Sequence, residues 1–310
     1  MSVLHPALSI SGPRRAGSRA ARVLGVGAAA AVLVALVPSG AHASPTAAAR
    51  GPATTDAPLV VAHRGSSGVA PENTVAAATA AVRHRAGSIE NDIQRTADGE
   101  LVLMHDTTLA RTTDVEERFP GRAPWRVADF TLAELRTLDA GSWFGEEFAG
   151  ERIPTLTEWA RAVGQRSDML IEVKSPALYP GIERDLDEAL RTDRVLRRAV
   201  RQGRVVVQSF DHAWLRTYEA IAPEVPVGLL FSARPTAAAI ADAATWAEQV
   251  NPAFRVLERA DVEAIQSAGL ETHVYTINDG ATMRRAIRWG VDGIITDYPQ
   301  VLRDLLRERR

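Results

Sequence analysis

From residue 59 onward, short apolar runs rich in β-branched residues alternate with longer amphipathic stretches. The runs predict nine strands, over residues 59–62, 89–93, 101–104, 169–173, 205–208, 227–230, 247–250, 272–276 and 293–296. The amphipathic stretches predict helices between them, for example over residues 73–85, 180–200, 212–221, 259–268 and 281–289. This alternation is typical of repeated βα units around a parallel sheet, so the predicted fold class is α/β.

Nine runs are one more than an eight-stranded barrel requires. The pair Asp98-Gly99 between the second and third runs is a strong hairpin signal, so the surplus run is interpreted as one arm of a hairpin. We therefore predict a (β/α)8 TIM-type barrel domain over residues 58–310. A doubly wound open sheet is the alternative, although no glycine-rich dinucleotide fingerprint follows the first predicted strand.

Residues 107–154 interrupt the alternation of strands and helices. They are rich in charge, glycine and proline, and they contain only one clear helix, over residues 132–138. We interpret them as a small insertion after the early strands, a kind of segment that often serves as a lid or specificity element. The aromatic residues Trp143, Phe144 and Phe148 fit the insertion's own core and a substrate cover equally well.

The first 43 residues are of a different kind. Four arginines and no acidic residue precede or flank an apolar run over 23–37, and Ala41-His42-Ala43 follows it. This order predicts a secretory signal peptide over residues 1–43 with cleavage after Ala43, a flexible linker over 44–57, and a secreted protein. The pair Arg14-Arg15 leaves the twin-arginine and general export routes both open.

The charge balance argues against a nucleic-acid-binding protein, and the cysteine content argues against stabilisation by disulfides. The 310 residues contain 36 Lys+Arg and 38 Asp+Glu; loss of the four leader arginines would leave 32 basic residues and a net charge of about −6. A nucleic-acid-binding domain normally carries the opposite balance. There is no cysteine, so an exported chain of this length would rely on its hydrophobic core rather than on disulfides. No later stretch is long and apolar enough to predict a transmembrane segment, and the oligomeric state stays open.

Polar residues gather where the predicted strands end, which is where barrel enzymes place their active sites. They are His63-Arg64-Gly65, Glu90 and Asp92, His105-Asp106, Glu172 and Lys174, Gln208-Ser209, Thr276 with Asn278, and Thr296-Asp297. Each has a structural explanation on its own, for example a salt bridge between Glu172 and Lys174. Together they combine carboxylates, imidazoles, a guanidinium and an ammonium, as metal-assisted chemistry on a phosphate ester requires.

The residue types suggest a division of roles. Glu90, Asp92 and Glu172 offer hard oxygen ligands for one divalent cation, Ca²⁺ or Mg²⁺. The cationic side chains of Arg64 and Lys174 suit the substrate phosphate. The two imidazoles, His63 and His105, can act as a general acid and base pair, with metal ligation by the histidines as the competing interpretation.

The motifs and their order resemble those of the glycerophosphodiester phosphodiesterase family. They comprise His63-Arg64-Gly65, Pro71-Glu72-Asn73-Thr74, Glu90-x-Asp92, Thr96-x-Asp98-Gly99, His105-Asp106, Asp139-Ala140-Gly141-Ser142-Trp143-Phe144, Ile153-Pro154-Thr155-Leu156, Glu172-x-Lys174, Gly290-Val291-Asp292-Gly293 and Thr296-Asp297-Tyr298-Pro299. The resemblance covers residues 59–305. Two positions depart from the family pattern: Asn91 stands where an apolar residue is usual, and Tyr275 stands where tryptophan is frequent.

The resemblance implies a (β/α) barrel that hydrolyses small glycerophosphodiesters to an alcohol and glycerol 3-phosphate. It implies metal binding by the positions of Glu90, Asp92 and Glu172, acid-base work by those of His63 and His105, and phosphate contacts at Arg64 and Lys174. A family route uses the neighbouring glycerol hydroxyl as nucleophile through a cyclic phosphate. Two alternatives remain: a phospholipase D-like enzyme acting on lysophospholipids or sphingolipids, and a non-catalytic binding protein on the same barrel.

Overall fold

The structure is a computed structural model that describes residues 57–308. The predicted leader over residues 1–43 and the predicted linker over 44–57, apart from residue 57, lie outside the described residues. Within residues 57–308, no helix has both the length and the apolar character needed to cross a membrane.

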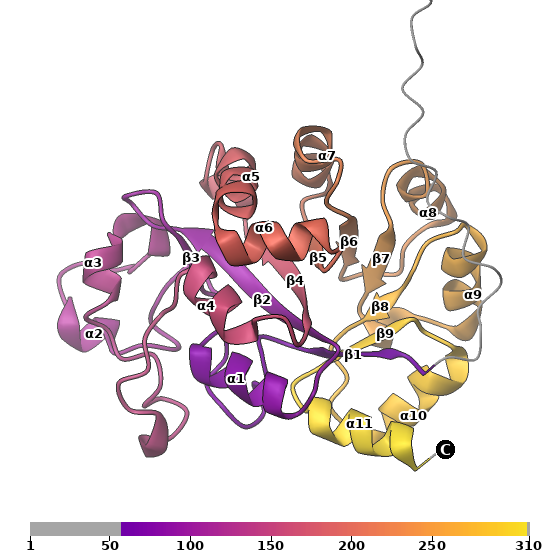
Figure 1. The fold of residues 1–310 in the computed structure, drawn as a ribbon, viewed down its shortest axis with the longest axis horizontal. Helices are drawn as coiled ribbons and strands as arrows, with labels where there is room; N and C mark the ends of the chain where they lie inside the picture. Colours follow the sequence, from indigo (N-terminus) through magenta and orange to yellow (C-terminus); the bar gives the residue numbers. More distant parts are fainter. Residues whose placement is uncertain (1–56, 309–310) are drawn as a thin grey trace, which may run out of the picture. The chain divides into compact units, whose positions relative to one another are not determined.

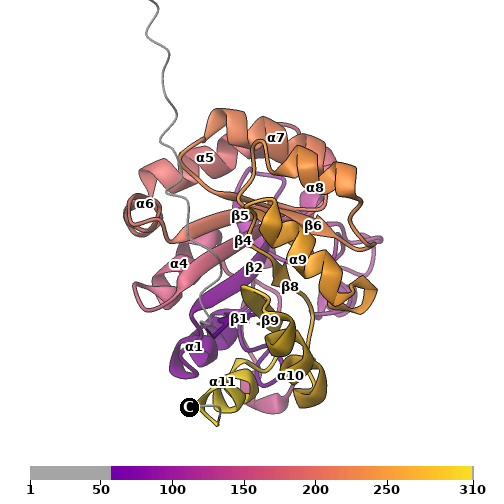
Figure 2. The same ribbon diagram turned by 90° about the vertical axis from the view of Figure 1, so that its right-hand side faces the viewer.

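Eight parallel strands form a nearly closed barrel (Figures 1 and 2). Their order around the sheet is β7 (Gln249–Pro252), β6 (Val227–Phe231), β5 (Val205–Ser209), β4 (Asp168–Val173), β2 (Ser88–Arg95), β1 (Leu59–Ala62), β9 (Gly293–Thr296) and β8 (His273–Val274). Single bridges join Gln249 to Glu271 and Ala253 to Tyr275, so β7 and β8 approach each other across the remaining gap. The predicted (β/α)8 barrel is therefore confirmed, and the alternative of a doubly wound open sheet is wrong.

The surplus run is β3 (Leu101–Leu103), which pairs antiparallel with the end of β2. The turn between them contains Gly99 at φ +94°, a left-handed conformation that glycine adopts without strain. The predicted hairpin is therefore present. On its return, the chain donates a hydrogen bond of 3.0 Å from Met104 N to Asp92 O, which brings the next residue, His105, back to the level of Asp92.

The helices surround the strands (Figures 1 and 2). They are α1 (Val75–Arg83), α4 (Leu156–Val163), α5 (Ile182–Thr192), α6 (Arg194–Arg201), α7 (His212–Ile221), α8 (Ala237–Ala243), α9 (Arg259–Ser267), α10 (Gly280–Trp289) and α11 (Pro299–Arg307). The prediction of one helix over 180–200 was wrong. Asp193 has an extended backbone, and its carboxylate accepts hydrogen bonds from Val195 N and Leu196 N, so a new helix begins there.

Other boundaries moved by a few residues. The strand predicted over 247–250 is observed at Gln249–Pro252, and the strand predicted over 272–276 is regular only at His273–Val274. Helix α1 begins after Thr74, whose side chain accepts a hydrogen bond from Ala77 N. Helices α4 and α8 also lie between predicted strands, in intervals for which no helix bounds were given.

Residues 107–154 contain two short helices, α2 (Val115–Arg118) and α3 (Leu132–Leu135), and two 3-10 turns, η1 (Val127–Asp129) and η2 (Glu146–Phe148). A separate core cluster joins this segment to Val102 and Met104 of the hairpin, through residues that include Leu109 and Phe130. The rings of Trp143, Phe144 and Phe148 lie outside that cluster and pack edge to face on one another.

Asn91 occupies an apolar position of β2. Alternation along the strand puts it on the same face as Ile89 and Ile93, which pack in the main core together with Trp159 of α4. Its side chain is fully buried, and neither polar atom has a hydrogen-bond partner among residues 57–308.

Replacing Asn91 with valine should therefore raise the free energy of unfolding, by about 1–3 kcal/mol, because a buried polar group without a partner costs that much. Urea unfolding of the two proteins at an unchanged m-value measures the difference. Gln94→Met is the matched control on the same strand: Gln94 donates to Met104 O and Asp106 O and accepts from Tyr179, so this variant should lose stability. A less stable Asn91→Val protein would contradict the expectation.

Candidate active site

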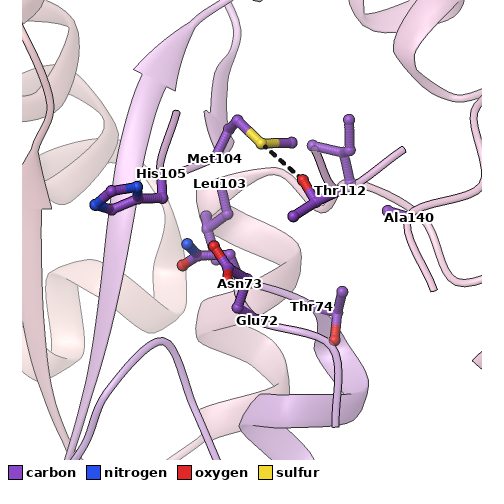
Figure 3. Close-up of a pocket in the computed structure, with 9 residues that line it drawn as sticks. Glu72, Asn73, Thr74, Leu103, Met104, His105, Thr112 and Ala140 are labelled. Carbon is purple, nitrogen blue, oxygen red and sulfur yellow. Dashed lines mark hydrogen bonds between the residues drawn. The ribbon is translucent and has the colours of Figure 1, made fainter. Parts of the chain in front are cut away.

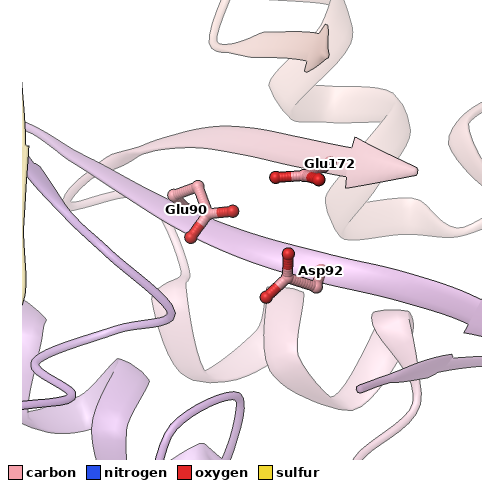
Figure 4. A group of neighbouring side chains, drawn as sticks. All are labelled: Glu90, Asp92 and Glu172. Carbon is pink, nitrogen blue, oxygen red and sulfur yellow. The ribbon is translucent and has the colours of Figure 1, made fainter. Parts of the chain in front are cut away.

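Three buried carboxylates meet at the carboxyl end of the barrel (Figure 4). The period of two along β2 turns Glu90 and Asp92 to the same inner face, and the strand register places Glu172 of β4 opposite Asp92. One carboxylate oxygen from each residue lies within 4.8 Å of those of the other two. The structure thus brings together the three residues predicted to hold a metal ion.

The electrostatics of this cluster favour a bound cation. Burial, and then the charges of Asp92 and Glu172, raise the pKa of Glu90 well above its ordinary value. Burial, and then Asp92, raise the pKa of Glu172 to about 7. Glu90 Oε1 and Asp92 Oδ1 have no hydrogen-bond partner among the residues that the structure describes. An all-oxygen donor set with two such atoms fits a hard divalent ion.

Arg64 follows β1 and lies against the carboxylates. Its N–H donates to Glu90 Oε2 at 2.7 Å, its Nε lies 3.2 Å from Asp92 Oδ2, and its Nη1 lies 2.9 Å from Glu72 Oε1. The backbone is left-handed here, with φ 53° at Arg64 and 84° at Gly65. A Cβ at Gly65 would lie 2.6 Å from the carbonyl carbon of Ala77, so the sharp turn that presents Arg64 requires glycine.

Lys174 follows β4 on the other side of the cluster. Its Nζ lies 2.6 Å from Glu172 Oε1, 3.6 Å from Asp92 Oδ1, and 5.6 Å from the ring centre of Phe210. Although burial opposes them, Arg64 and Lys174 lower the pKa of Asp92 below its ordinary value. Two cations therefore flank one ionised carboxylate, in a position to share an anionic ligand.

Each predicted catalytic histidine has a carboxylate at its Nδ1. His63 Nδ1 lies 2.7 Å from Asp297 Oδ1, and His105 Nδ1 lies 2.7 Å from Asp106 Oδ1. A carboxylate at this position accepts the Nδ1 proton, so Nε2 carries the lone pair of the neutral ring. Burial lowers the pKa of His105, and Arg64 adds to that effect although Asp92 opposes it.

Several contacts were not foreseen. Asp297 was interpreted as a possible strand end, yet it orients His63 and is itself held by Ser67 Oγ at 3.0 Å and Asn278 Nδ2 at 2.6 Å. Asn73 was interpreted as a helix start, but its side chain donates to Asp92 Oδ2 at 2.8 Å and accepts from Asp92 N. The sequence signal available for both was their position beside predicted strand ends or within a family motif.

The site is confined to one arc of the barrel. Its residues come from, or directly follow, β9, β1, β2 and β4, which are neighbours in the sheet, together with the β3 arm of the hairpin. Figure 3 shows how Glu72 and Asn73, from the loop before α1, lie beside His105 around a small cavity. On the opposite arc, the rings of Phe210 after β5 and Tyr275 after β8 pack edge to face at 6.0 Å.

An anionic ester between Arg64 and Lys174 would meet two positive charges beside the three buried carboxylates. The same rim carries two imidazoles, each with a carboxylate at Nδ1. On this barrel rim, such a combination defines a hydrolase of phosphate esters.

Comparison with known proteins places the chain within that class. The family model described as "Glycerophosphoryl diester phosphodiesterase family" matches residues 63–301. A glycerophosphodiester phosphodiesterase of Caldanaerobacter subterraneus is 40% identical over 252 residues, covering 81% of this chain and 98% of the relative. A glycerophosphodiester phosphodiesterase of Bacillus subtilis is 38% identical over 255 residues, covering 78% of this chain and 84% of the relative.

A solved phosphodiesterase of Oleispira antarctica, in complex with the product sn-glycerol-3-phosphate, is 30% identical. It superposes with a TM-score of 0.72, over 81% of this chain and 97% of the solved one. The chain belongs to the glycerophosphoryl diester phosphodiesterase family, and it is a phosphodiesterase.

Proposed function

We propose that the enzyme hydrolyses glycerophosphodiesters to an alcohol and glycerol 3-phosphate, and that the reaction depends on one divalent cation. The observation that carries the proposal is the group of three buried carboxylates between Arg64 and Lys174, with two oriented histidines beside it. The product held by the solved Oleispira relative supports the same glycerol 3-phosphate product here.

Glu90, Asp92 and Glu172 would hold the cation, Ca²⁺ or Mg²⁺. When bound, such an ion neutralises charge on a phosphate oxygen. Arg64 and Lys174 would bind and orient the same phosphate group, since the Arg64 side chain lies on one side of the carboxylates and the Lys174 side chain on the other.

His63 and His105 would move the protons. One neutral ring accepts at Nε2 the proton of the neighbouring glycerol hydroxyl as its oxygen attacks phosphorus, while the other ring, protonated on both nitrogens, donates its Nε2 proton to the departing alcohol. Water then opens the cyclic phosphate with the roles reversed: the deprotonated ring takes a proton from water and the protonated ring returns one to the glycerol oxygen, so that one water is consumed and both rings end as they began. Asp297 and Asp106 hold the rings in the tautomer that this exchange requires.

The deciding assay follows glycerol 3-phosphate released from glycerophosphocholine by the full chain. Chelator should reduce the rate to the background, and either Ca²⁺ or Mg²⁺ should restore it, because the ion that the three carboxylates would hold neutralises charge on the phosphate. An undiminished rate in chelator would contradict the metal requirement.

A lipid substrate is the second candidate, because large apolar side chains are exposed on loops at the same rim. Leu178, after β4, is 53% exposed, and Phe210, after β5, is 45% exposed. Choline release separates the two candidates, because lysophosphatidylcholine gives choline and lysophosphatidic acid where glycerophosphocholine gives choline and glycerol 3-phosphate. Faster choline release from the lysophospholipid than from glycerophosphocholine would favour the lipid.

A further inference from the structure

One arginine bridges two carboxylates next to the site. Arg111 donates to both oxygens of Asp106, with Nε at 2.6 Å from Oδ2 and Nη2 at 3.1 Å from Oδ1. It also donates to both oxygens of Glu72, with Nη1 at 2.9 Å from Oε2 and Nη2 at 2.7 Å from Oε1. Planar guanidinium groups fix carboxylates in this forked way, whereas an ammonium group contributes only a point charge.

Both carboxylates have a second contact in the site. Asp106 accepts from His105 Nδ1, and Glu72 accepts from Arg64 Nη1 at 2.9 Å. Arg111 thus completes a continuous chain of contacts from one predicted catalytic histidine to the predicted phosphate-binding arginine. The proposed chemistry itself assigns no task to Arg111.

A purely stabilising role explains little of this geometry. The Arg111 side chain is 43% exposed, and exposed ion pairs contribute about 0–1 kcal/mol. The segment that carries Arg111 has its own apolar core, with Leu109 and Val115 fully buried. The hydrogen bond from Arg111 also lowers the pKa of Asp106 to about 2, so that this carboxylate stays an ionised acceptor further into the acid range than an ordinary Asp.

We propose that Arg111 is a positioning residue for His105: it holds both oxygens of Asp106, so that Asp106 keeps the His105 ring in one orientation with its proton on Nδ1. This inference rests on the proposed function, in which His105 transfers a proton at Nε2. Arg111 itself touches no reacting atom. Glu72 anchors the far side of the guanidinium and ties that orientation to Arg64.

Arg111→Ala should lower kcat by about 10–100-fold, the usual effect of removing a group that orients a catalytic ligand, and change KM by less than about threefold. Arg111→Lys keeps the charge without the fork and should lose most of the same rate. Added guanidinium ion should restore part of the rate of Arg111→Ala. Arg118→Ala is the matched control, since Arg118 lies in the same segment and, among residues 57–308, its side chain hydrogen-bonds only Asp114.

A double-mutant cycle identifies the route of the effect. His105→Ala should lower kcat by about 10²–10⁴-fold, and adding Arg111→Ala to it should cost less than about twofold more. Full additivity would overturn the inference in favour of an effect through Glu72 and Arg64. A normal rate for Arg111→Ala beside an impaired His105→Ala would overturn the positioning role alone. A normal rate for His105→Ala would remove the proposed role of His105 and the inference with it.

Folding is checked on the same samples. Arg111→Ala and Arg111→Lys should unfold thermally within a few degrees of the parent protein and bind Ca²⁺ or Mg²⁺ with unchanged affinity. If Arg111→Ala does not fold, Arg111→Lys carries the test: a parent-like kcat in that variant would overturn the inference.

Discussion

Replacing Glu90 with glutamine is expected to lower kcat/KM for glycerophosphocholine on the order of 10³-fold, because a bound cation supplies several kcal/mol of charge stabilisation. The amide keeps the shape of the side chain but offers a weaker ligand to the ion. Steady-state rates measure the loss, and calorimetric titration with Ca²⁺ or Mg²⁺ should show weakened binding. Glu100→Gln, at an exposed position of the same hairpin, should behave like the parent protein.

Stability in chelator gives an independent reading of Glu90→Gln. The raised pKa of Glu90 shows that its ionised form is disfavoured by burial and by Asp92 and Glu172. Without an ion, the glutamine variant should therefore unfold at a higher temperature than the parent protein, whereas added cation should stabilise the parent protein more. A variant that binds the cation as tightly as the parent and turns over normally would refute the assignment of Glu90.

The second large effect is expected for His63→Ala. Loss of one positioned proton-transfer group should reduce kcat by about 10²–10⁴-fold while cation binding persists. The weaker change Asp297→Asn should cost about 10–100-fold, because the amide no longer holds the Nδ1 proton in the same way. Parent-like turnover by His63→Ala would refute the role of His63.

A change of leaving group can then separate the acid from the base. A p-nitrophenyl ester of glycerol phosphate releases an alcohol that leaves without protonation, so the variant that lacks the general acid should recover most of its rate on that substrate. We expect recovery in only one of His63→Ala and His105→Ala. Equal recovery in both variants would contradict a division of labour between the two histidines.

The barrel could be predicted because each strand is marked by the composition of its own short stretch of sequence. Runs such as those in β1 and β5 are short, β-branched and apolar, and parallel strands bring their carboxyl ends to one rim. Residues that belong to one strand, such as Glu90 and Asp92, could therefore be placed on one face from spacing alone. The hairpin was predictable as well, because the Asp98-Gly99 turn is a local signal.

The partners of the site could not be predicted, because they meet only after the barrel closes. His63 and Asp297 are separated by 234 positions, and Arg111 and Glu72 by 39. No periodicity relates such pairs. The prediction of one continuous helix across Asp193 failed for a different reason. The residues on both sides are good helix formers, and the chain breaks only because Asp193 is extended and caps the second helix.

The arc arrangement of the site has a consequence for evolution and for engineering. Chemistry occupies β9, β1, β2 and β4, so the loops after β5, β6, β7 and β8 carry none of the proposed proton-transfer, cation or phosphate groups. The loops after β5 and β8 still support the site, through Phe210 beside Lys174 and Asn278 on Asp297. The loops after β6 and β7 can therefore accept insertions and randomised sequences while the reaction stays intact. A library of variants confined to the loops after β6 and β7 can be screened for new alcohol leaving groups while the catalytic residues stay unchanged.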